Sequence, residues 1–238
     1  MSSTSGYRVV LIGATGAVGS NVLATLLRLP AVASVTTLGR RAAAIDESPP
    51  PGRLAQHVVE MADPGSYRHH LAGHTDAVCT LGVGQPSKMA REEVWTIEVD
   101  YVLAFAGACR EAGVERFSLM TSAGADRTSR FHYLHMKGEL EARVAALGFR
   151  RVSLFRPSML LTPENRYGVS QAITLAMWPK LDFLLAGAMR RYRGIRVEDL
   201  GRAIAIDAAR EEPAEGTHIY EWDGFQEILR GAATAPRA

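Results

Sequence analysis

Residues 9–19 read VVLIGATGAVG, and this stretch decides the fold expected for the chain. The four apolar residues from Val9 to Ile12 form a run typical of a buried strand. A glycine-rich turn with Gly13, Gly16 and Gly19 follows, and an apolar helical pattern begins directly behind it. The first N–H groups of a helix are unpaired and carry a partial positive charge. A strand, a tight glycine turn and a helix N-terminus therefore predict a cradle for a pyrophosphate group.

The spacing of the glycines is Gly-x-x-Gly-x-x-Gly, which differs from the usual Gly-x-Gly-x-x-Gly fingerprint of dinucleotide binding. Gly13 permits the sharp turn, Gly16 lets the backbone approach phosphates, and Gly19 lets the helix pack closely on the strand. An ordinary strand–helix turn is the alternative, because glycine makes up 22 of the 238 residues. The contacts predicted from this turn to the cofactor are Gly13, Thr15, Gly16, Ala17, Val18 and Gly19.

The length and composition indicate one α/β domain spanning residues 1–238. Hydrophobic residues account for 47% and charged residues for 22% of the chain, which is ordinary for a globular protein. The net charge of +2 predicts no general attraction to nucleic acid or to a membrane surface. The N-terminal residues MSSTSGYR lack the apolar region of a signal peptide, so we expect a cytoplasmic location.

The cysteines and histidines do not predict a metal site. Cys79 and Cys109 lie in apolar elements without metal-ligand spacing, which indicates buried free thiols in a reducing compartment. His69, His70 and His74 have no accompanying Cys or carboxylate ligand pattern, and two adjacent histidines of a helix point in different directions.

Short β-rich runs alternate with helical patterns, which predicts βαβ units and a parallel sheet. The expected strands are 7–12, 34–39, 55–60, 76–81, 116–121, 150–156 and 217–222, and the expected helices lie near 17–29, 64–72, 88–112, 128–147, 170–188 and 198–210. Residues 160–195 break this alternation after the end of a strand, where substrate-binding segments of such folds are found. We expect them, with the C-terminal part, to form a substrate-side region that includes Tyr167 and Trp178.

The residues after the second expected strand favour NADP over NAD. NAD-binding chains usually place an acidic residue there to bind the ribose 2′-hydroxyl, whereas this strand is followed by Arg40 and Arg41. A guanidinium group can hold a 2′-phosphate through two hydrogen bonds. A pair of solvated arginines is the alternative.

The segments after the next two expected strands supply further predicted contacts to the cofactor. Glu60 and Met61 follow the third strand and are expected to flank the adenine. Gly82 and Val83 follow the fourth strand and are expected to line the nicotinamide ribose, with Val83 to Ser87 also lining the substrate pocket.

The candidate reacting groups follow the fifth strand. Ser122 ends that strand, and Tyr133 and Lys137 stand four residues apart on one face of the next helix. A phenol has a pKa of about 10, and a nearby ammonium group lowers it. We therefore expect Tyr133 to exchange a proton with the substrate, Lys137 to lower the pKa of Tyr133 and hold the ribose, and Ser122 to orient the substrate oxygen. The alternative is a surface tyrosine that packs on a lysine stem.

The motifs GATGAVG, TSAGAD and YLHMK occur in the order found in short-chain dehydrogenases/reductases. Residues 100–144, with LGRR and FRPSMLL, resemble the atypical branch typified by the Tat-interacting-protein oxidoreductases. The resemblance implies a Rossmann-type doubly wound parallel sheet with a small C-terminal substrate-side extension, which binds NADP. It also implies the reacting set Ser122, Tyr133 and Lys137, cofactor contacts from the glycines, Arg40 and Arg41, and an approach of Pro157 and Ser158 to the nicotinamide.

The chain departs from the wider family in two respects. Many extended members carry Asn where this chain has Asp100, and an ionised Asp cannot donate a hydrogen bond to a water relay. The substrate region is short, so the pocket is either shallow or completed by a second copy in a homodimer.

Two functions are therefore weighed. One is an NADP-dependent oxidoreductase that acts on a small carbonyl or alcohol, and the other is a non-catalytic NADP(H)-binding sensor that acts through protein partners. The intact set of reacting residues favours the enzyme.

Overall fold

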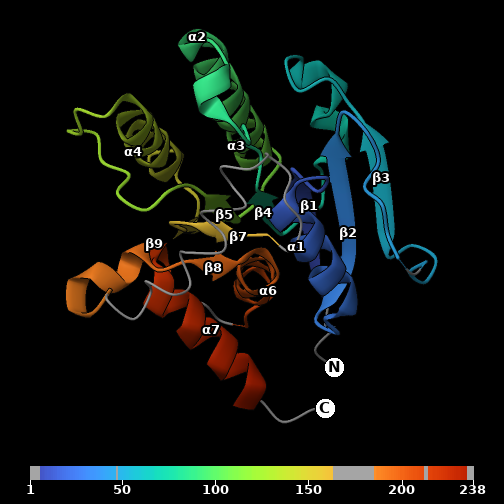
Figure 1. Cartoon of the computed structure of the whole chain (residues 1–238). Coiled ribbons are helices and arrows are strands. Elements are labelled where there is room, and N and C mark those ends of the chain that lie inside the picture. The colour runs from blue at the N-terminus through green and yellow to red at the C-terminus, as the bar shows by residue number, and fades with distance from the viewer. Residues whose placement is uncertain (1–5, 47, 163–184, 212–213, 235–238) are drawn as a thin grey trace.

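The computed structural model describes residues 6–46, 48–162, 185–211 and 214–234. Its centre is a seven-stranded sheet in the order β3-β2-β1-β4-β5-β6-β9, in which every neighbouring pair is parallel (Figure 1). The strands are β1 (Tyr7–Ile12), β2 (Val32–Gly39), β3 (Leu54–Val58), β4 (Asp76–Cys79), β5 (Arg116–Met120), β6 (Arg151–Phe155) and β9 (Gly216–Tyr220). A separate short pair joins β7 (Leu160–Leu161) to β8 (Ile195–Arg196). The predicted doubly wound α/β fold is confirmed.

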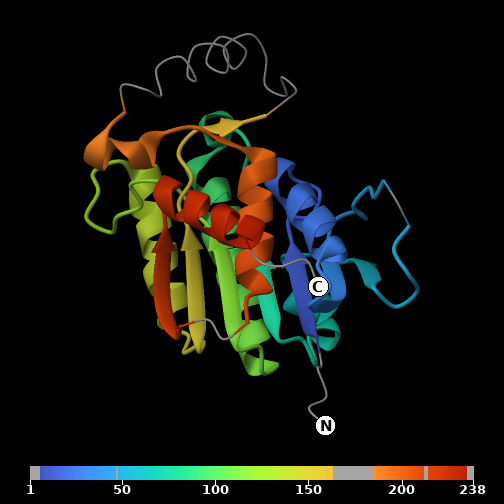
Figure 2. The same ribbon diagram turned by 90° about the horizontal axis from the view of Figure 1, so that it is seen from below.

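Helices cover both faces of the sheet (Figures 1 and 2). One layer consists of α1 (Ala17–Arg28), α6 (Val197–Ala208) and α7 (Trp222–Thr234), and the other contains α2 (Arg91–Trp95), α3 (Tyr101–Glu111) and α4 (His132–Ala145). The side chains of β1 alternate between the two resulting cores. Val9 and Leu11 pack with the first layer, and Val10 and Ile12 pack with the second. Both faces of the strand are therefore buried, which is why its sequence is an uninterrupted apolar run.

The order of the strands creates a switch point between β1 and β4. From β1 the chain proceeds outward to β2 and β3, and it then returns to place β4 on the other side of β1. Connections from the C-terminal ends of β1 and β4 therefore diverge to opposite sides, which leaves a crevice at that edge.

Several predicted helix boundaries were wrong because local turn chemistry ends the helical pattern. The helix expected at 64–72 is two short 3-10 turns, Pro64–Ser66 and Arg68–His70, and the carboxylate of Asp63 accepts the Gly65 N–H at 2.9 Å to start the first one. The helix expected from 128 begins at His132, since Asp126 accepts the Thr128 N–H at 2.8 Å in a turn. The helix expected from 88 begins at Arg91, after the 3-10 turn Pro86–Lys88.

One helix was missed. α7 follows the last strand and buries Phe225 and Ile228, although Gly224 and Gly231 weaken its sequence signal. Tyr167, Trp178 and most of the helix predicted at 170–188 lie outside the described residues.

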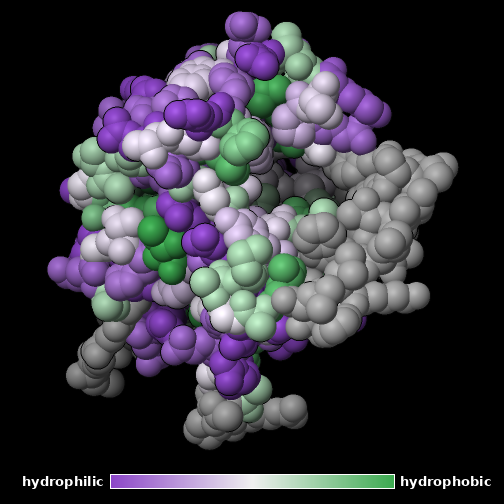
Figure 3. Space-filling view, turned by 60° about the vertical axis from the view of Figure 1, so that its left-hand side comes forward, coloured by the Kyte–Doolittle hydropathy of each residue, from purple (hydrophilic) through white to green (hydrophobic). Residues whose placement is uncertain are grey.

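Both cysteines are buried free thiols, as predicted. Burial raises the pKa of Cys79 to about 12, so this thiol is unreactive at neutral pH. Within the described ranges, no helix is long and apolar enough to cross a bilayer. The face seen in Figure 3 carries mostly hydrophilic side chains, with small hydrophobic patches between them.

Candidate cofactor and active site

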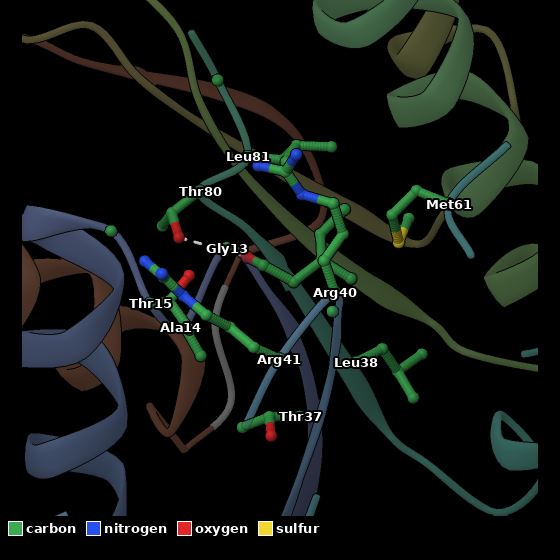
Figure 4. A pocket seen from close by; sticks show the side chains of 14 residues that line it. Gly13, Ala14, Thr15, Thr37, Leu38, Arg40, Arg41, Met61, Thr80 and Leu81 are labelled. Carbon is green, nitrogen blue, oxygen red and sulfur yellow. Dashed lines mark hydrogen bonds between the residues drawn. The ribbon is translucent and has the colours of Figure 1, made fainter. Parts of the chain in front are cut away.

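A cavity of about 390 Å³ opens at the switch point, where β1, β2 and β4 end (Figure 4). It is lined by Ile12, Gly13, Ala14, Thr15, Gly16, Thr37, Leu38, Gly39, Arg40, Arg41, Met61, Thr80, Leu81 and Gly82. The residues predicted to bind the cofactor that meet here are Gly13, Thr15, Gly16, Arg40, Arg41, Met61 and Gly82. The fold thus gathers segments that are up to about seventy residues apart around one space.

The three glycines of the turn have different surroundings. Gly13 has a positive φ of 85°, and a Cβ there would lie 2.6 Å from the carbonyl carbon of Thr80. A Cβ on Gly19 would lie 2.1 Å from the carbonyl oxygen of Gly13. At Gly16 the nearest atom would be that same oxygen at 3.2 Å, and apart from the chain neighbours no other described atom would lie within 4 Å. Gly13 and Gly19 therefore allow close packing of α1, whereas Gly16 leaves its side of the cavity open.

The N-terminus of α1 faces this cavity, and no acidic residue among those the structure describes caps it. Its N-cap, Gly16, makes no side-chain cap hydrogen bond, and the first turn contains no acidic residue. The amides of this turn are therefore suited to bind a phosphate group. Val18 and Gly19 are buried behind the turn, so only their backbone groups can serve a ligand.

Two exposed arginines complete the anion-binding character of the cavity. Figure 4 shows the side chains of Arg40 and Arg41 extending over different parts of it, Arg41 toward Thr15 and Arg40 toward Leu81. Met61 is buried in the wall. Glu60 is exposed and outside the lining, and its N–H donates to the hydroxyl of Ser66 at 3.1 Å. Cationic groups and free amides around one space fit a dinucleotide phosphate.

A second cavity, of about 700 Å³, lies between α4 and the segment that follows β4. Its lining is Val83, Gly84, Pro86, Ser87, Met89, Arg91, Val94, His132, Tyr133 and Met136. Most of these side chains are apolar, and Tyr133 is the predicted proton-exchanging group. His132, which precedes Tyr133 on α4, is exposed and also lines this cavity.

Lys137 lies one helical turn beyond Tyr133 and is buried. Its ammonium is 5.8 Å from the centroid of the Tyr133 ring and forms an ion pair with Glu98. The side chains of Lys137 and Glu98 are 4% and 1% exposed. Glu98 also accepts the N–H of Val83 at 2.7 Å, so it joins the segment after β4 to α4.

The expected lowering of the pKa of Tyr133 is not what the structure indicates. Burial raises the pKa of this phenol, Lys137 lowers it, and Glu98 raises it again, so that the pKa lies above its ordinary value of 10.0. Burial also acts against the ammonium of Lys137, but Glu98 and Tyr133 together outweigh this effect and raise the pKa of Lys137. Tyr133 is consequently protonated at neutral pH.

The remaining predicted residues lie near the ends of β5 and β6. The Ser122 hydroxyl is half-buried and donates to the carbonyl oxygen of Ala123 at 3.4 Å. Among the described residues, no hydrogen bond joins Ser122 to Tyr133. The carbonyl oxygen of Pro157 accepts the Ala123 N–H at 2.9 Å, which ties the two strand ends together, and Ser158 follows half-buried. Asp100 is exposed.

Sequence reasoning missed Glu98, which is the most buried acidic side chain in contact with a predicted reacting group. A signal was present, because Glu98 stands in the same i, i+4 row as the apolar residues Val94 and Val102. Thr80 and Leu81, which line the cofactor cavity, were also missed. Thr80 binds the carbonyl oxygen of Ile12 at 3.1 Å and thereby supports the glycine turn.

Comparison with known sequences gives matches over the region that contains both cavities. Residues 13–166 match the family described as NAD(P)H-binding. Protein HTATIP2 of Rattus norvegicus is 35% identical over 162 residues, which are 67% of this chain and 66% of that protein. Protein fmp52, mitochondrial, of Emericella nidulans is 34% identical over 169 residues, which are 69% of this chain and 72% of that protein. The chain thus spans about two thirds of the length of these relatives.

Solved structures show the same fold at low sequence identity. MoeE5 in complex with UDP-glucose and NAD has a TM-score of 0.67 at 17% identity, over 95% of this chain and 81% of that one. The Bordetella bronchiseptica enzyme WbmG in complex with NAD has a TM-score of 0.64 at 18% identity, over 98% of this chain and 83% of that one.

Proposed function

Because this chain belongs to the NAD(P)H-binding family, we propose that it is an NADP(H)-dependent oxidoreductase that acts on a small carbonyl or alcohol. One observation carries the proposal. Tyr133 lines an apolar cavity, and the buried ammonium of Lys137 lies one helical turn away. The proposed phosphate-binding cavity is adjacent, because Gly82 lines it and the next residue, Val83, lines the cavity of Tyr133.

The reaction divides between the cofactor and the residues of the chain. A bound nicotinamide cofactor supplies or accepts a hydride, and the chain supplies binding, orientation and proton transfer. The turn at Gly13 to Gly19 would hold the pyrophosphate, and Lys137 would hold the ribose. Tyr133 exchanges a proton with the substrate oxygen, which Ser122 orients.

Arg40 and Arg41 support the preference for NADP over NAD, since both line the cofactor cavity and its described lining contains no acidic residue. A charge-assisted hydrogen bond contributes about 1.5–3 kcal/mol. We expect Arg40→Ala with Arg41→Ala to weaken NADPH binding about tenfold or more and to change NADH binding much less. Equal losses for both cofactors in calorimetric titrations would refute the assignment.

The lining of the second cavity supports a substrate with an apolar body, because Val83, Pro86, Met89, Val94 and Met136 surround Tyr133. We also propose that a second copy of the chain completes this cavity. We further propose a reducing, cytoplasmic location, which the two buried free thiols support. The fungal relatives are named as mitochondrial proteins.

The test is NADPH oxidation by the purified protein over a panel of aldehydes and ketones. We expect turnover by the wild type, its loss in Tyr133→Phe with cofactor binding kept, and no change in Tyr7→Phe, which removes a hydroxyl at the start of β1 and outside both cavities. Equal turnover by wild type and Tyr133→Phe would refute the role of Tyr133. Tight NADPH binding without turnover, together with a stable protein partner, would instead support the sensor.

A further inference from the structure

The connection between α2 and α3 contains one turn of π-helix, Thr96–Asp100, and Glu98 lies within it. Turns of π-helix are rare in proteins, and many of those that occur lie at functional sites. In this turn the side chain of Glu98 lies inside the α2–α3–α4 layer, and the residue is 1% exposed. A buried charge is costly unless it is paired and hydrogen-bonded, so the partners of Glu98 must account for its position.

Glu98 has two partners from different parts of the site. One carboxylate oxygen forms the ion pair with the Lys137 ammonium on α4. The other accepts the Val83 N–H at 2.7 Å, and a Cβ on Gly82 would lie 3.3 Å from the same oxygen. Glu98 therefore connects the helix that carries the reacting pair to the segment that separates the two cavities.

Lys137 and Glu98 act on the pKa of Tyr133 in opposite directions. The Cys79 thiol on β4 also lies near Lys137 and is neutral at physiological pH, and Arg91 on α2 and His132 on α4 line the same cavity as Tyr133. A lone ammonium beside a phenol stabilises its anion, but an ammonium already paired with a carboxylate does so much less. Tyr133 then responds mainly to its burial, which favours the neutral phenol.

We propose that Glu98 is a positioning residue that holds Lys137 and Val83 in place and, by neutralising the ammonium, keeps Tyr133 as a proton donor, so that the site works at neutral pH as a carbonyl reductase. This inference rests on the proposed function. In that direction the carbonyl carbon gains a hydride, with its electron pair, from NADPH, and the carbonyl oxygen takes the phenolic proton of Tyr133. The phenolate then regains a proton from solvent. The reverse oxidation requires the phenolate and is slow at neutral pH.

The proposal is tested by titrating Tyr133 in the protein without substrate or cofactor. Carbon-13 NMR of protein labelled at the ζ carbon of tyrosine follows each phenol, and Tyr133→Phe identifies the signal of Tyr133. We expect Glu98→Gln, which keeps an oxygen for the Val83 N–H but removes the charge, to lower the pKa of Tyr133 by about one pH unit or more. Glu93→Gln, an exposed change on α2, is the matched control and should leave it unaltered.

A Tyr133 signal that titrates at the same or higher pH in Glu98→Gln would overturn the proposal. If Glu98→Gln does not fold, the titration of the wild type still tests the proposal. The proposal requires the pKa of Tyr133 to lie above that of free tyrosine, about 10. A lower value would overturn the proposal. In the active enzyme, the pH at which kcat for alcohol oxidation rises should move down in Glu98→Gln together with the pKa of Tyr133. A wild type that reduces no carbonyl would refute the proposed function, whereas the titration would still report whether Glu98 acts on Tyr133.

Discussion

Replacing Gly19 by alanine tests how tightly α1 must pack against the strand ends. The new Cβ would lie 2.1 Å from the Gly13 carbonyl oxygen and 2.6 Å from the Thr80 hydroxyl oxygen. Neither atom can move freely, because the Gly13 oxygen accepts the Gly16 N–H at 2.9 Å and the Thr80 hydroxyl donates to Ile12 at 3.1 Å. Relief of the contact therefore requires a shift of the helix or of the turn.

The magnitude follows from two opposing effects. Alanine in place of glycine inside a helix stabilises it by about 1 kcal/mol. Overpacking costs about 1–3 kcal/mol, and a contact with backbone atoms belongs at the upper end of that range. The net loss is about 2 kcal/mol, which for a chain of this length corresponds to a decrease in Tm of about 4–8 °C.

The assay is urea unfolding followed by circular dichroism, with Gly107→Ala on α3 as the control. A Cβ on Gly107 would meet no described atom outside its own helix backbone within 4 Å, so this variant should be more stable than the wild type by about 0.5–1 kcal/mol. The midpoints of the two variants should therefore move in opposite directions at an unchanged m value. A Gly19→Ala variant that is as stable as the wild type would refute the packing argument.

Three further outcomes are expected. Gly16→Ala, whose Cβ would meet only the Gly13 oxygen at 3.2 Å, should change stability little but weaken NADPH binding about tenfold or more; unaltered affinity in calorimetry would contradict the assigned phosphate approach. Burial lowers the pKa of His74 in the folded protein below 6.5, the value in the unfolded chain. As the pH falls, the unfolded chain therefore binds the proton before the folded protein does. The stability present above pH 6.5 should accordingly decrease as the pH falls below 6.5. The urea midpoint of the wild type should decrease as the pH is lowered from 7.5 to 5, and the midpoint of His74→Gln should decrease less steeply. Asp207→Ala removes the partner of the buried Arg151 side chain, 3.0 Å away, and should cost about 3–5 kcal/mol; a loss below about 1 kcal/mol in the same assay would show that the pair is not needed.

The fold could be predicted to a large extent because its signals are local. The apolar run of β1 and the glycine spacing behind it are contiguous in the sequence, and Gly13 and Gly19 have the backbone conformation or the close neighbour that requires glycine. The seven strands of the main sheet were found for the same reason. The errors lie where a few hydrogen bonds compete with the helical pattern, as at Asp63 and Asp126, or where glycines weaken it, as in α7.

The candidate site was predictable only in part. Tyr133 and Lys137 share a helix face because four residues make about one turn, and Arg40 and Arg41 reach the cofactor cavity because they follow a strand beside β1. Glu98 is 39 residues from Lys137 in the sequence, and only the packing of the π turn against α4 brings the two together.

The sequence by itself determined the glycine turn and the candidate reacting pair, because both depend on short-range spacing that any strand or helix preserves. Only the tertiary structure decided the direction in which the pKa of each group of that pair shifts. A pKa depends on burial and on charges a few ångströms away, and those neighbours come from distant segments that meet only in the folded chain.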